Sequence, residues 1–593
     1  MNRHTYDFGV IGNCAFTAHI HKNTNIVWMC WPRFDSSFIF GSLVDEEKGG
    51  EFSVIPCEPN ASFNQYYIEN TNVLCTEVEA ADGKFRVTDF APRFYQNDRY
   101  YKPLMMVRKI EPIQGNPRVK VECEPRGDYG KIIPEQSQGS NHIRFLGLDG
   151  HVRLTTNIPL AYVMEDEAFV LNETKYLVFT SGPPLEAPLV ATVESFLSRT
   201  ISYWRNWVKT TSIYDFYQSQ VIRSALALKI HQYEDTGAIV AATTTSLPEA
   251  PGTGRNWDYR FCWMRDTYYT LTAFNSIGHF EELEKYFQYI LNTSATHKGR
   301  LQPLYGISES SNVIEETLPL KGYMGNGPVR IGNDAYTHIQ NDVYGQVLVS
   351  LLPLYTDRRF IGKERSDSLK LVYQALEMIE NTMEEPDAGL WEFRNLAQKH
   401  CYTYLFHWAG SAAAVKIARH NGDQVMGVKA QKLMEKSAKK IEECYVPAKK
   451  GYAQAIGVER MDASTLQLIM MNYFQGDTKR ANDHLMALEK ELKGKGGLFY
   501  RYKHVDDFGS PETTFLICAF WYVEALACVG RLDEAIKTFE NTIAYANHVG
   551  LLSEDVSESD GSMWGNFPQA YSHVGLLNAA NRIARKLDRP SFL

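Results

Sequence analysis

The segment Ser181-Gly182-Pro183-Pro184-Leu185-Glu186-Ala187-Pro188 separates two parts of the sequence that have different hydrophobic patterns. Before this segment, short runs of alternating polar and apolar residues are interrupted by tight-turn signals. Asp82-Gly83 and Asp149-Gly150 each lie between two such runs. Because Asp-Gly between alternating runs is a strong indication of a β-hairpin, we expect residues 1–190 to form an antiparallel β-sandwich.

After the segment, from about Val193 onward, helical periodicity dominates. Tyr214–Gln232 and Phe515–Cys528 carry broad apolar faces, and Asp462 can cap a helix that continues through Tyr473. Polar, aromatic-rich segments that are too elaborate for simple turns lie between the helices. This alternation predicts a helical toroid with a functional site at its loop end, although periodicity alone does not distinguish a closed toroid from an open helical array.

Composition excludes several classes of protein. The chain has 593 residues, which is too many for one core, and its 44% hydrophobic and 22% charged residues are typical of a globular protein. The formal net charge is −9, and no run of Lys or Arg provides a binding surface for phosphates. No apolar run reaches the roughly 20 residues of a membrane helix. We expect neither a nucleic-acid nor a membrane partner.

The N-terminus and the cysteines bear on cellular location. Met1–Asp7 lacks the basic stretch and apolar core of a secretory signal, and the ten cysteines include no Cys-x-x-Cys pair. Both features favour the cytoplasm, although a mature chain whose signal had been removed would look the same. His19 and His21 alternate as on one strand face but lack a convincing third metal ligand. We expect no metal and no cofactor.

The segment from Arg255 to Asp266 combines charged and aromatic side chains in a way that packing does not require. An adjacent arginine and aspartate, Arg265 and Asp266, can hold vicinal sugar hydroxyls because the guanidinium donates and the carboxylate accepts hydrogen bonds. Tyr259 and Trp263 can supply an apolar wall. A structural ion pair at the start of a helix explains the same residues equally well.

Three later segments carry further candidates. In Trp391-Glu392, the low polarity of the indole ring disfavours the ionised carboxyl, which can then donate a proton to a glycosidic oxygen. Arg501 lies among aromatic residues and can either clamp a hydroxyl or stack. Glu554-Asp555 can activate water, but taken alone this pair is more readily explained as a helix cap.

The four segments, in this order, resemble the glucoamylase-type family of glycoside hydrolases (family 15), in particular the bacterial branch that also contains trehalases. The resemblance covers nearly the whole chain. Further segments are similar to that family at the N-terminus and between the motifs: Asp7–Ala15, Trp31–Ser36, Glu315–Leu318, Gly322-Tyr323 and Pro328–Asn333.

The resemblance implies an N-terminal β-sandwich (1–190), a helical linker (191–215) and a catalytic (α/α)6 barrel (216–593). It also implies hydrolysis by a single displacement with inversion, with Glu392 as the general acid and Glu554 as the general base. The resemblance also implies that the terminal glucose is bound by the following residues: Arg265, Asp266, Tyr259, Trp263, Trp391 and Arg501. Glu315 and Glu316 fall in a segment that serves the substrate pocket in this family.

The expected function is therefore exo-acting hydrolysis of α-1,4- or α-1,6-linked gluco-oligosaccharides with release of β-glucose. The alternative is a trehalase, which cleaves the α,α-1,1 linkage. Met324 stands near a position where starch-active members of the family can carry tryptophan, so the substrate preference stays open. A carbohydrate-binding protein without catalysis and an inverting phosphorylase are further alternatives. The substrate is a small oligosaccharide or disaccharide, and the sequence does not determine the oligomeric state.

Overall fold

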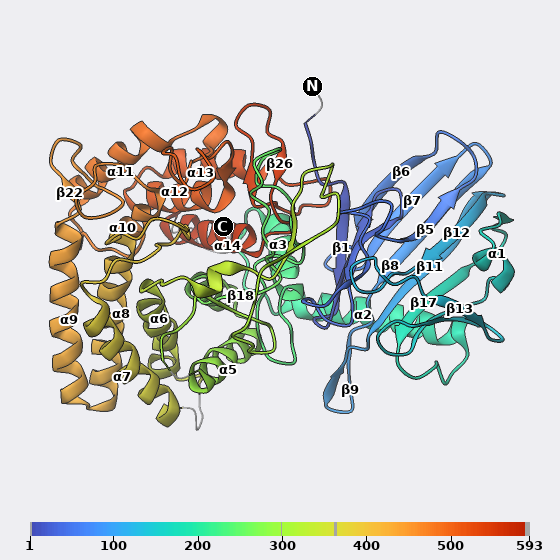
Figure 1. The fold of residues 1–593 in the computed structure, drawn as a ribbon, viewed down its shortest axis with the longest axis horizontal. Helices are drawn as coiled ribbons and strands as arrows, with labels where there is room; N and C mark the ends of the chain where they lie inside the picture. The colour runs from blue at the N-terminus through green and yellow to red at the C-terminus, as the bar shows by residue number, and fades with distance from the viewer. Residues whose placement is uncertain (1–2, 298, 361–364, 588–593) are drawn as a thin grey trace.

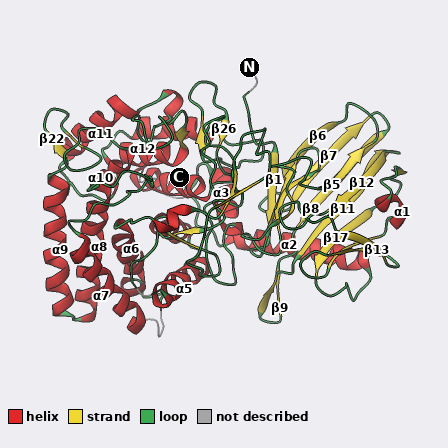
Figure 2. Cartoon of the chain, viewed as in Figure 1, coloured by secondary structure: helices red, strands yellow, loops and turns green. Residues whose placement is uncertain are grey.

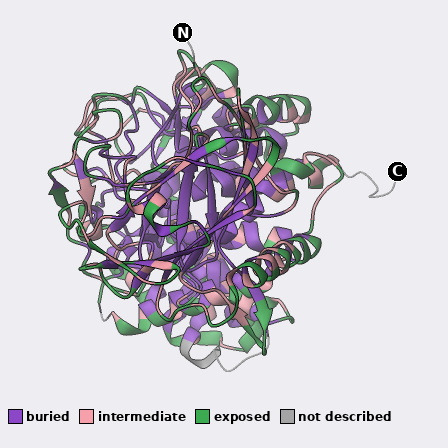
Figure 3. Cartoon of the chain, turned by 90° about the vertical axis from the view of Figure 1, so that its right-hand side faces the viewer, coloured by how far each residue is buried: buried purple, intermediate pink, exposed green. Residues whose placement is uncertain are grey.

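The computed structural model describes residues 3–297, 299–360 and 365–587. Strands gather at one end of the molecule and helices at the other (Figures 1 and 2). Viewed from the strand-rich end, buried segments lie in the interior, whereas exposed segments lie on peripheral helices and loops (Figure 3). None of the described helices is long and apolar enough to cross a membrane.

The strand-rich part contains a large antiparallel sheet, two smaller sheets of four and three strands, and a two-stranded sheet of β9 (Phe94–Gln96) and β10 (Arg99–Tyr101). In spatial order, the eight-stranded sheet consists of β13 (Glu135–Gln138), β14 (His142–Leu146), β15 (Val152–Thr156), β17 (Lys175–Ser181), β11 (Met105–Gly115), β8 (Gly83–Phe90), β7 (Leu74–Ala80) and β6 (Ser62–Tyr67). The smaller sheets are β1 (Phe8–Gly12), β2 (Thr17–His21), β3 (Ile26–Cys30) and β4 (Phe38–Phe40), and β16 (Phe169–Val170), β12 (Arg118–Glu124) and β5 (Glu51–Pro56).

Both predicted hairpins are confirmed. Ala80 of β7 pairs with Gly83 of β8, so the turn is formed at Ala81-Asp82, and Asp149-Gly150 lies in the turn between β14 and β15. In β12, alternate residues are buried, as expected for a strand with one face on the core. The sandwich therefore follows from period-two patterning combined with glycine at the turns.

The helix α2 (Leu189–Lys209) leads from the sheets to the helical part and begins directly after Pro188. Proline has no N–H for a central strand, and its fixed φ suits the start of a helix, so Pro188 marks the change of structure. The limits of the three predicted domains stay a prediction.

The helical part is a closed double ring. The inner helices are α4 (Asp266–Ile277), α6 (Asp342–Thr356), α8 (Cys401–Asn421), α10 (Gln467–Met470), α12 (Leu516–Cys528) and α14 (Ala570–Leu587). Each contacts the next, and α14 contacts α4, which closes the ring. The outer helices are α3 (Gln218–Ile230), α5 (Phe280–Thr296), α7 (Arg365–Thr382), α9 (Gln424–Glu442), α11 (Thr478–Leu492) and α13 (Leu532–Ile543). The (α/α)6 barrel is confirmed.

Burial separates inner from outer helices. In α12, every residue from Leu516 to Ala527 is buried. In α9, by contrast, the buried residues Met426, Ala430, Leu433, Ser437 and Ile441 recur every three or four positions and form a single face. A helix that is apolar all round belongs inside the double ring, and a one-sided helix belongs on its outside.

The helix predicted after Asp462 is shorter than expected. Asp462 caps a 3-10 helix, η2 (Ala463–Leu466), since its Oδ1 accepts a hydrogen bond from the N–H of Ser464 at 2.7 Å; η2 runs directly into α10, which ends at Met470. Asn472 follows in the left-handed region with φ of 57°, which a continuing α-helix does not allow. The expected continuation through Tyr473 is therefore wrong.

Candidate active site

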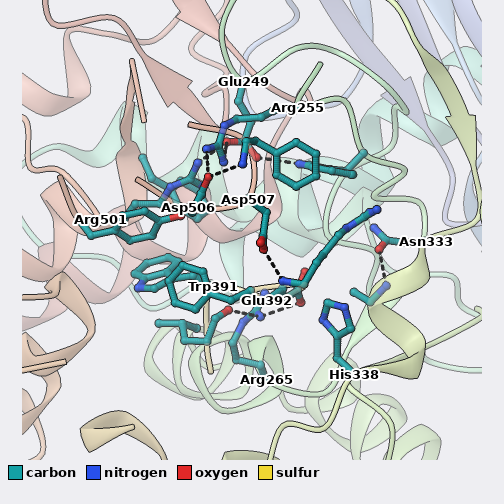
Figure 4. A pocket seen from close by; sticks show the side chains of 18 of the residues that line it. Glu249, Arg255, Arg265, Asn333, His338, Trp391, Glu392, Arg501, Asp506 and Asp507 are labelled. Carbon is teal, nitrogen blue, oxygen red and sulfur yellow. Dashed lines mark hydrogen bonds and ion pairs between the residues drawn. The ribbon is translucent and has the colours of Figure 1, made fainter. Parts of the chain in front are cut away.

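A pocket lies at the end of the barrel where the inner helices begin (Figure 4). Its empty volume is about 720 Å³, a value that includes open solvent at its mouth. The lining comes from the segments 249–265, 333–338, 390–394 and 501–515, and from Tyr571. Segments far apart in the sequence meet here because each precedes or begins an inner helix.

Five of the predicted residues line the pocket: Tyr259, Arg265, Trp391, Glu392 and Arg501. Three others lie directly behind its wall, each bonded to a lining residue. Trp263 contacts Glu392, Asp266 contacts Arg265, and Glu554 contacts Tyr259. The structure thus brings together eight of the ten predicted residues.

Glu392 lies on a tight turn that begins at Gly389 (φ 68°). Its own φ is 61°, a conformation that costs energy for a residue with a side chain and that tends to occur at functional sites. Its Oε1 accepts hydrogen bonds from Trp263 Nε1 at 2.7 Å, Arg265 Nη1 at 3.0 Å and Gln340 Nε2 at 3.4 Å. Among the described residues, nothing donates a hydrogen bond to Oε2.

Glu554 is only 1% exposed and immediately precedes β25 (Asp555–Val556). Its Oε1 accepts a hydrogen bond from Tyr259 at 2.8 Å, and its Oε2 accepts one from the N–H of Asn566 at 3.2 Å. Burial and the nearby carboxylate of Glu249 raise the pKa of Glu554 to about 8, although these two hydrogen bonds oppose the shift.

Two aromatic side chains connect the carboxyl groups of Glu392 and Glu554. Tyr259 donates to Glu554, and its ring packs edge-on against Trp263 with the ring centroids 5.3 Å apart. Trp263 in turn donates to Glu392. The Glu392 carboxyl therefore lines the pocket and the Glu554 carboxyl lies behind its wall, each held by one of two aromatic side chains that pack together.

Gly565 leaves room for the carboxyl of Glu554. A Cβ at this position would lie 2.6 Å from Oε2 of Glu554 and 2.5 Å from its Cβ. The φ of Gly565 is +77°, which favours glycine independently of the available space. No other residue fits here without displacing the Glu554 side chain.

The sequence left open whether Arg265 and Asp266 belong to a sugar site or form a structural ion pair at a helix start, and the structure shows features of both. They form an ion pair at the start of α4, with Arg265 Nε 3.2 Å from Asp266 Oδ1. Arg265 also contacts Glu392 and lines the pocket. Burial, together with Glu392, raises the pKa of Asp266 to about 6 even though Arg265 opposes the shift.

Trp391 and Arg501 are each held by a buried carboxylate. Trp391 Nε1 donates to Asp462 Oδ2 at 2.7 Å, and Arg501 forms a buried ion pair with Glu249. The other oxygen of Asp462 caps the short 3-10 helix η2 (Ala463–Leu466), so this side chain fixes Trp391 relative to the segment that leads into α10.

The structure does not bring Glu315 and Glu316 into the pocket. Glu315 pairs with Arg330 at 3.2 Å and with Arg394 at 3.1 Å, and so acts on the pocket only through Arg394, which lines it. Glu316 is exposed in β20 (Glu316–Leu318), which pairs with β21 (Val329–Ile331). Sequence similarity identified this segment but did not show which way its side chains point.

Sequence reasoning missed Glu249, which lines the pocket and is buried. Its carboxylate accepts a hydrogen bond from Trp257 Nε1 at 2.9 Å, in addition to its ion pair with Arg501. Pro248 and Pro251 flank it and suggest an ordinary turn. The one available signal was its position shortly before the Arg255 segment. Other lining residues were also missed: Asn333, His338, Asp506, Asp507, Phe508 and Tyr571.

Comparisons with known proteins follow the same division of the chain. A model of "Glycosyl hydrolases family 15" matches residues 215–581, and a "Trehalase-like, N-terminal" model matches residues 2–166. The trehalase of Thermoplasma volcanium is 32% identical over 98% of this chain and 93% of its own length. The trehalase of Mycobacterium tuberculosis is 28% identical over 98% of this chain and 89% of its own.

A solved structure has the same fold over nearly the whole chain. A bacterial glucoamylase complexed with acarbose superposes with a TM-score of 0.68 at 16% sequence identity, covering 99% of this chain and 96% of that one. The match includes both the strand-rich part and the barrel.

Proposed function

Because this chain belongs to glycosyl hydrolase family 15, we propose that it hydrolyses α,α-trehalose with inversion at the attacked carbon. The chain is a glycoside hydrolase. Curated relatives that match it over nearly the whole length, including the N-terminal part, are trehalases. This favours the trehalase alternative over the expected action on α-1,4- or α-1,6-linked oligosaccharides.

One observation carries the proposal for the mechanism. The carboxyl group of Glu392, at the pocket, and that of Glu554, directly behind the pocket wall, are held by the packed pair Trp263 and Tyr259. An inverting hydrolase needs one carboxyl group on each side of the scissile bond, about 6.5–9.5 Å apart, because a water molecule must fit on one side. Aromatic side chains between the two carboxyl groups support such a separation.

Glu392 is proposed as the general acid. Its Oε1 is occupied by donors from Trp263 and Arg265, which fix the orientation of the carboxyl group. The proton then resides on Oε2 and passes to the glycosidic oxygen as the bond to the leaving glucose breaks. The same contacts stabilise the carboxylate that remains after proton transfer.

Glu554 is proposed as the general base. Ionised Glu554 accepts a proton from a water molecule, and the oxygen of that water attacks the anomeric carbon from the face opposite the leaving glucose. This mechanism requires a water molecule to enter between the sugar and the wall formed by Tyr259. The transition state is positively charged at the sugar ring, and the surrounding carboxylates stabilise it.

Arg265 and Asp266 are proposed to hold the hydroxyls of the terminal glucose, with Trp391 and Arg501 beside them. Arg265 lines the pocket and contacts the acid directly, so that binding of the ring and placement of the proton are linked. A terminal ring held in a pocket, not a cleft, suits a short substrate. We propose the cytoplasm as the location, supported by ten cysteines that all occur as thiols, eight of them buried.

Glucose release from trehalose, maltose and isomaltose, each with and without inorganic phosphate, tests the proposed substrate. We expect kcat/KM for trehalose to exceed that for the other two by about tenfold or more, a difference of the size that contacts to the second sugar can supply. Added phosphate should not change the products, so glucose should be the only sugar released in its presence as well. Faster hydrolysis of maltose would restore the glucoamylase reading, and formation of glucose 1-phosphate would identify a phosphorylase.

A further inference from the structure

A loop of residues 503–509, here called the strap, lies along the pocket between Tyr502 and the start of α12. Asp506, Asp507 and Phe508 of the strap line the pocket. No motif in the sequence indicated a role for these residues. Figure 4 shows Asp506 on the side of Arg255 and Arg501, and Asp507 pointing toward the turn that carries Glu392.

Asp506 anchors one side of the strap. Its carboxylate forms an ion pair with Arg255 and accepts hydrogen bonds from Tyr502 and from the N–H of Phe508, the last at 2.8 Å. The ring of Phe508 packs edge-on against Trp257, with the centroids 5.1 Å apart. The strap is therefore fixed to the segment that contains Arg255 and Trp257.

Asp507 anchors the other side, on the turn that follows Glu392. Its Oδ2 accepts hydrogen bonds from the backbone N–H of Arg394 at 2.6 Å and of Asn395 at 3.2 Å. Its Oδ1 accepts a third from the side-chain amide of Asn395 at 2.9 Å. One carboxylate thus satisfies two successive backbone donors.

These bonds complete the support of the Glu392 turn. The N–H of Glu392 donates to Gly389 O and that of Phe393 to Ala388 O, both at 3.2 Å. The next two N–H groups, of Arg394 and Asn395, are those bonded by Asp507. Because Glu392 has a positive φ, surrounding contacts must hold this turn in place. Asp507 supplies the contacts on the pocket side.

We propose that Asp507 is a positioning residue, which holds the turn of Glu392 so that its proton reaches the glycosidic oxygen of the leaving sugar. This inference rests on the proposed role of Glu392 as general acid. Asp507 is itself exposed, so its replacement leaves the core packing intact. Its effect is therefore measurable in a folded enzyme.

The test compares two substrates that differ in their need for an acid. Trehalose requires protonation of its leaving oxygen. In α-glucosyl fluoride, by contrast, the fluoride ion leaves without help from a strong acid. We expect Asp507→Ala to lower kcat on trehalose by about 10–100-fold, the size of effect that a small misplacement of a catalytic group produces. On α-glucosyl fluoride we expect a loss of less than about threefold. Asp507→Asn, whose amide oxygen still accepts from backbone N–H groups, should lose less than the alanine variant.

Two control variants should match the wild type on both substrates. Val505→Ala changes an exposed strap residue that is 71% accessible, and Asp560→Ala removes another exposed aspartate that accepts from a backbone N–H, that of Ser562. Equal losses on trehalose and α-glucosyl fluoride in Asp507→Ala, or no loss on either, would overturn the inference. If Glu392→Gln shows the selective loss and Asp507→Ala does not, only the role of Asp507 fails. If neither shows it, the proposed function fails as well.

Discussion

Replacing Glu392 with glutamine should lower kcat on trehalose by about 10²–10⁴-fold, the contribution of general acid catalysis, while leaving substrate binding nearly unchanged. The amide oxygen of glutamine can still accept the hydrogen bonds that Trp263 and Arg265 donate to Oε1, so the turn keeps its position. The amide cannot transfer a proton to the glycosidic oxygen. The loss should therefore fall on kcat and not on KM.

Substrate choice separates this effect from general damage. The variant Glu392→Gln should retain most of the wild-type rate on α-glucosyl fluoride. Glu443→Gln, which changes an exposed glutamate at the end of α9 that pairs with Lys440, is the matched control and should behave as wild type. Full activity of Glu392→Gln on trehalose would show that another group is the acid.

Replacing Glu554 with glutamine should lower kcat by about 10²–10⁴-fold on trehalose and on α-glucosyl fluoride alike. The base acts on water, so a good leaving group does not compensate for its loss. Added azide should restore part of the turnover of α-glucosyl fluoride and give β-glucosyl azide, because azide needs no deprotonation and enters from the face that water uses. An α-glucosyl azide product would contradict inversion.

The pKa of Glu554 connects this residue to the pH dependence of the enzyme. Burial and the charge of Glu249 raise this pKa to about 8 from an ordinary value of 4.5, and a base must be ionised to act. The rising limb of kcat/KM against pH should therefore lie well above the pH at which an ordinary glutamate ionises. Glu249→Gln removes the neighbouring charge and should move this limb to lower pH. A limb that stays in place would show that Glu249 does not act on Glu554.

The same shift predicts a change in stability. Because the folded state holds the Glu554 proton more tightly than the unfolded state, this group stabilises the protein fully below pH 4.5, and the contribution is lost as pH rises to about 8. Glutamine does not ionise, so its contribution to the free energy of unfolding does not change over this pH range. The Tm of Glu554→Gln minus that of wild type should thus increase between pH 5 and pH 8 in calorimetric scans, in contrast to its loss of activity.

Much of the fold could be predicted from local pattern. Asp82-Gly83 between alternating runs gave a hairpin whose register is now known, and Pro188 marks where strands give way to α2. Closure of the barrel depends on contact between α14 and α4, which are separated by almost the whole helical part. Periodicity describes one helix at a time, so it carries no information about such a contact.

The site was only partly predictable for a related reason. Trp391, Glu392 and Arg501 lie in segments that combine charged and aromatic residues, but only the resemblance to family 15 assigned them to the site. Asp462 was recognised as a helix cap, but its second oxygen binds Trp391, from a segment more than seventy residues earlier. Glu249 lies between prolines in a segment typical of a turn. Its partner Arg501 lies far from it in the sequence, near the other end of the helical part. Such pairings arise from tertiary structure alone.

Proton NMR of the wild-type enzyme acting on trehalose, followed from the first minutes, tests the central claim most directly. Attack with inversion releases one glucose as the β-anomer, while the leaving glucose keeps its α-configuration. We predict that α- and β-glucose appear in equal amounts before mutarotation changes their ratio. Initial release of α-glucose alone would indicate retention and contradict the assignment of Glu392 and Glu554 as an inverting pair.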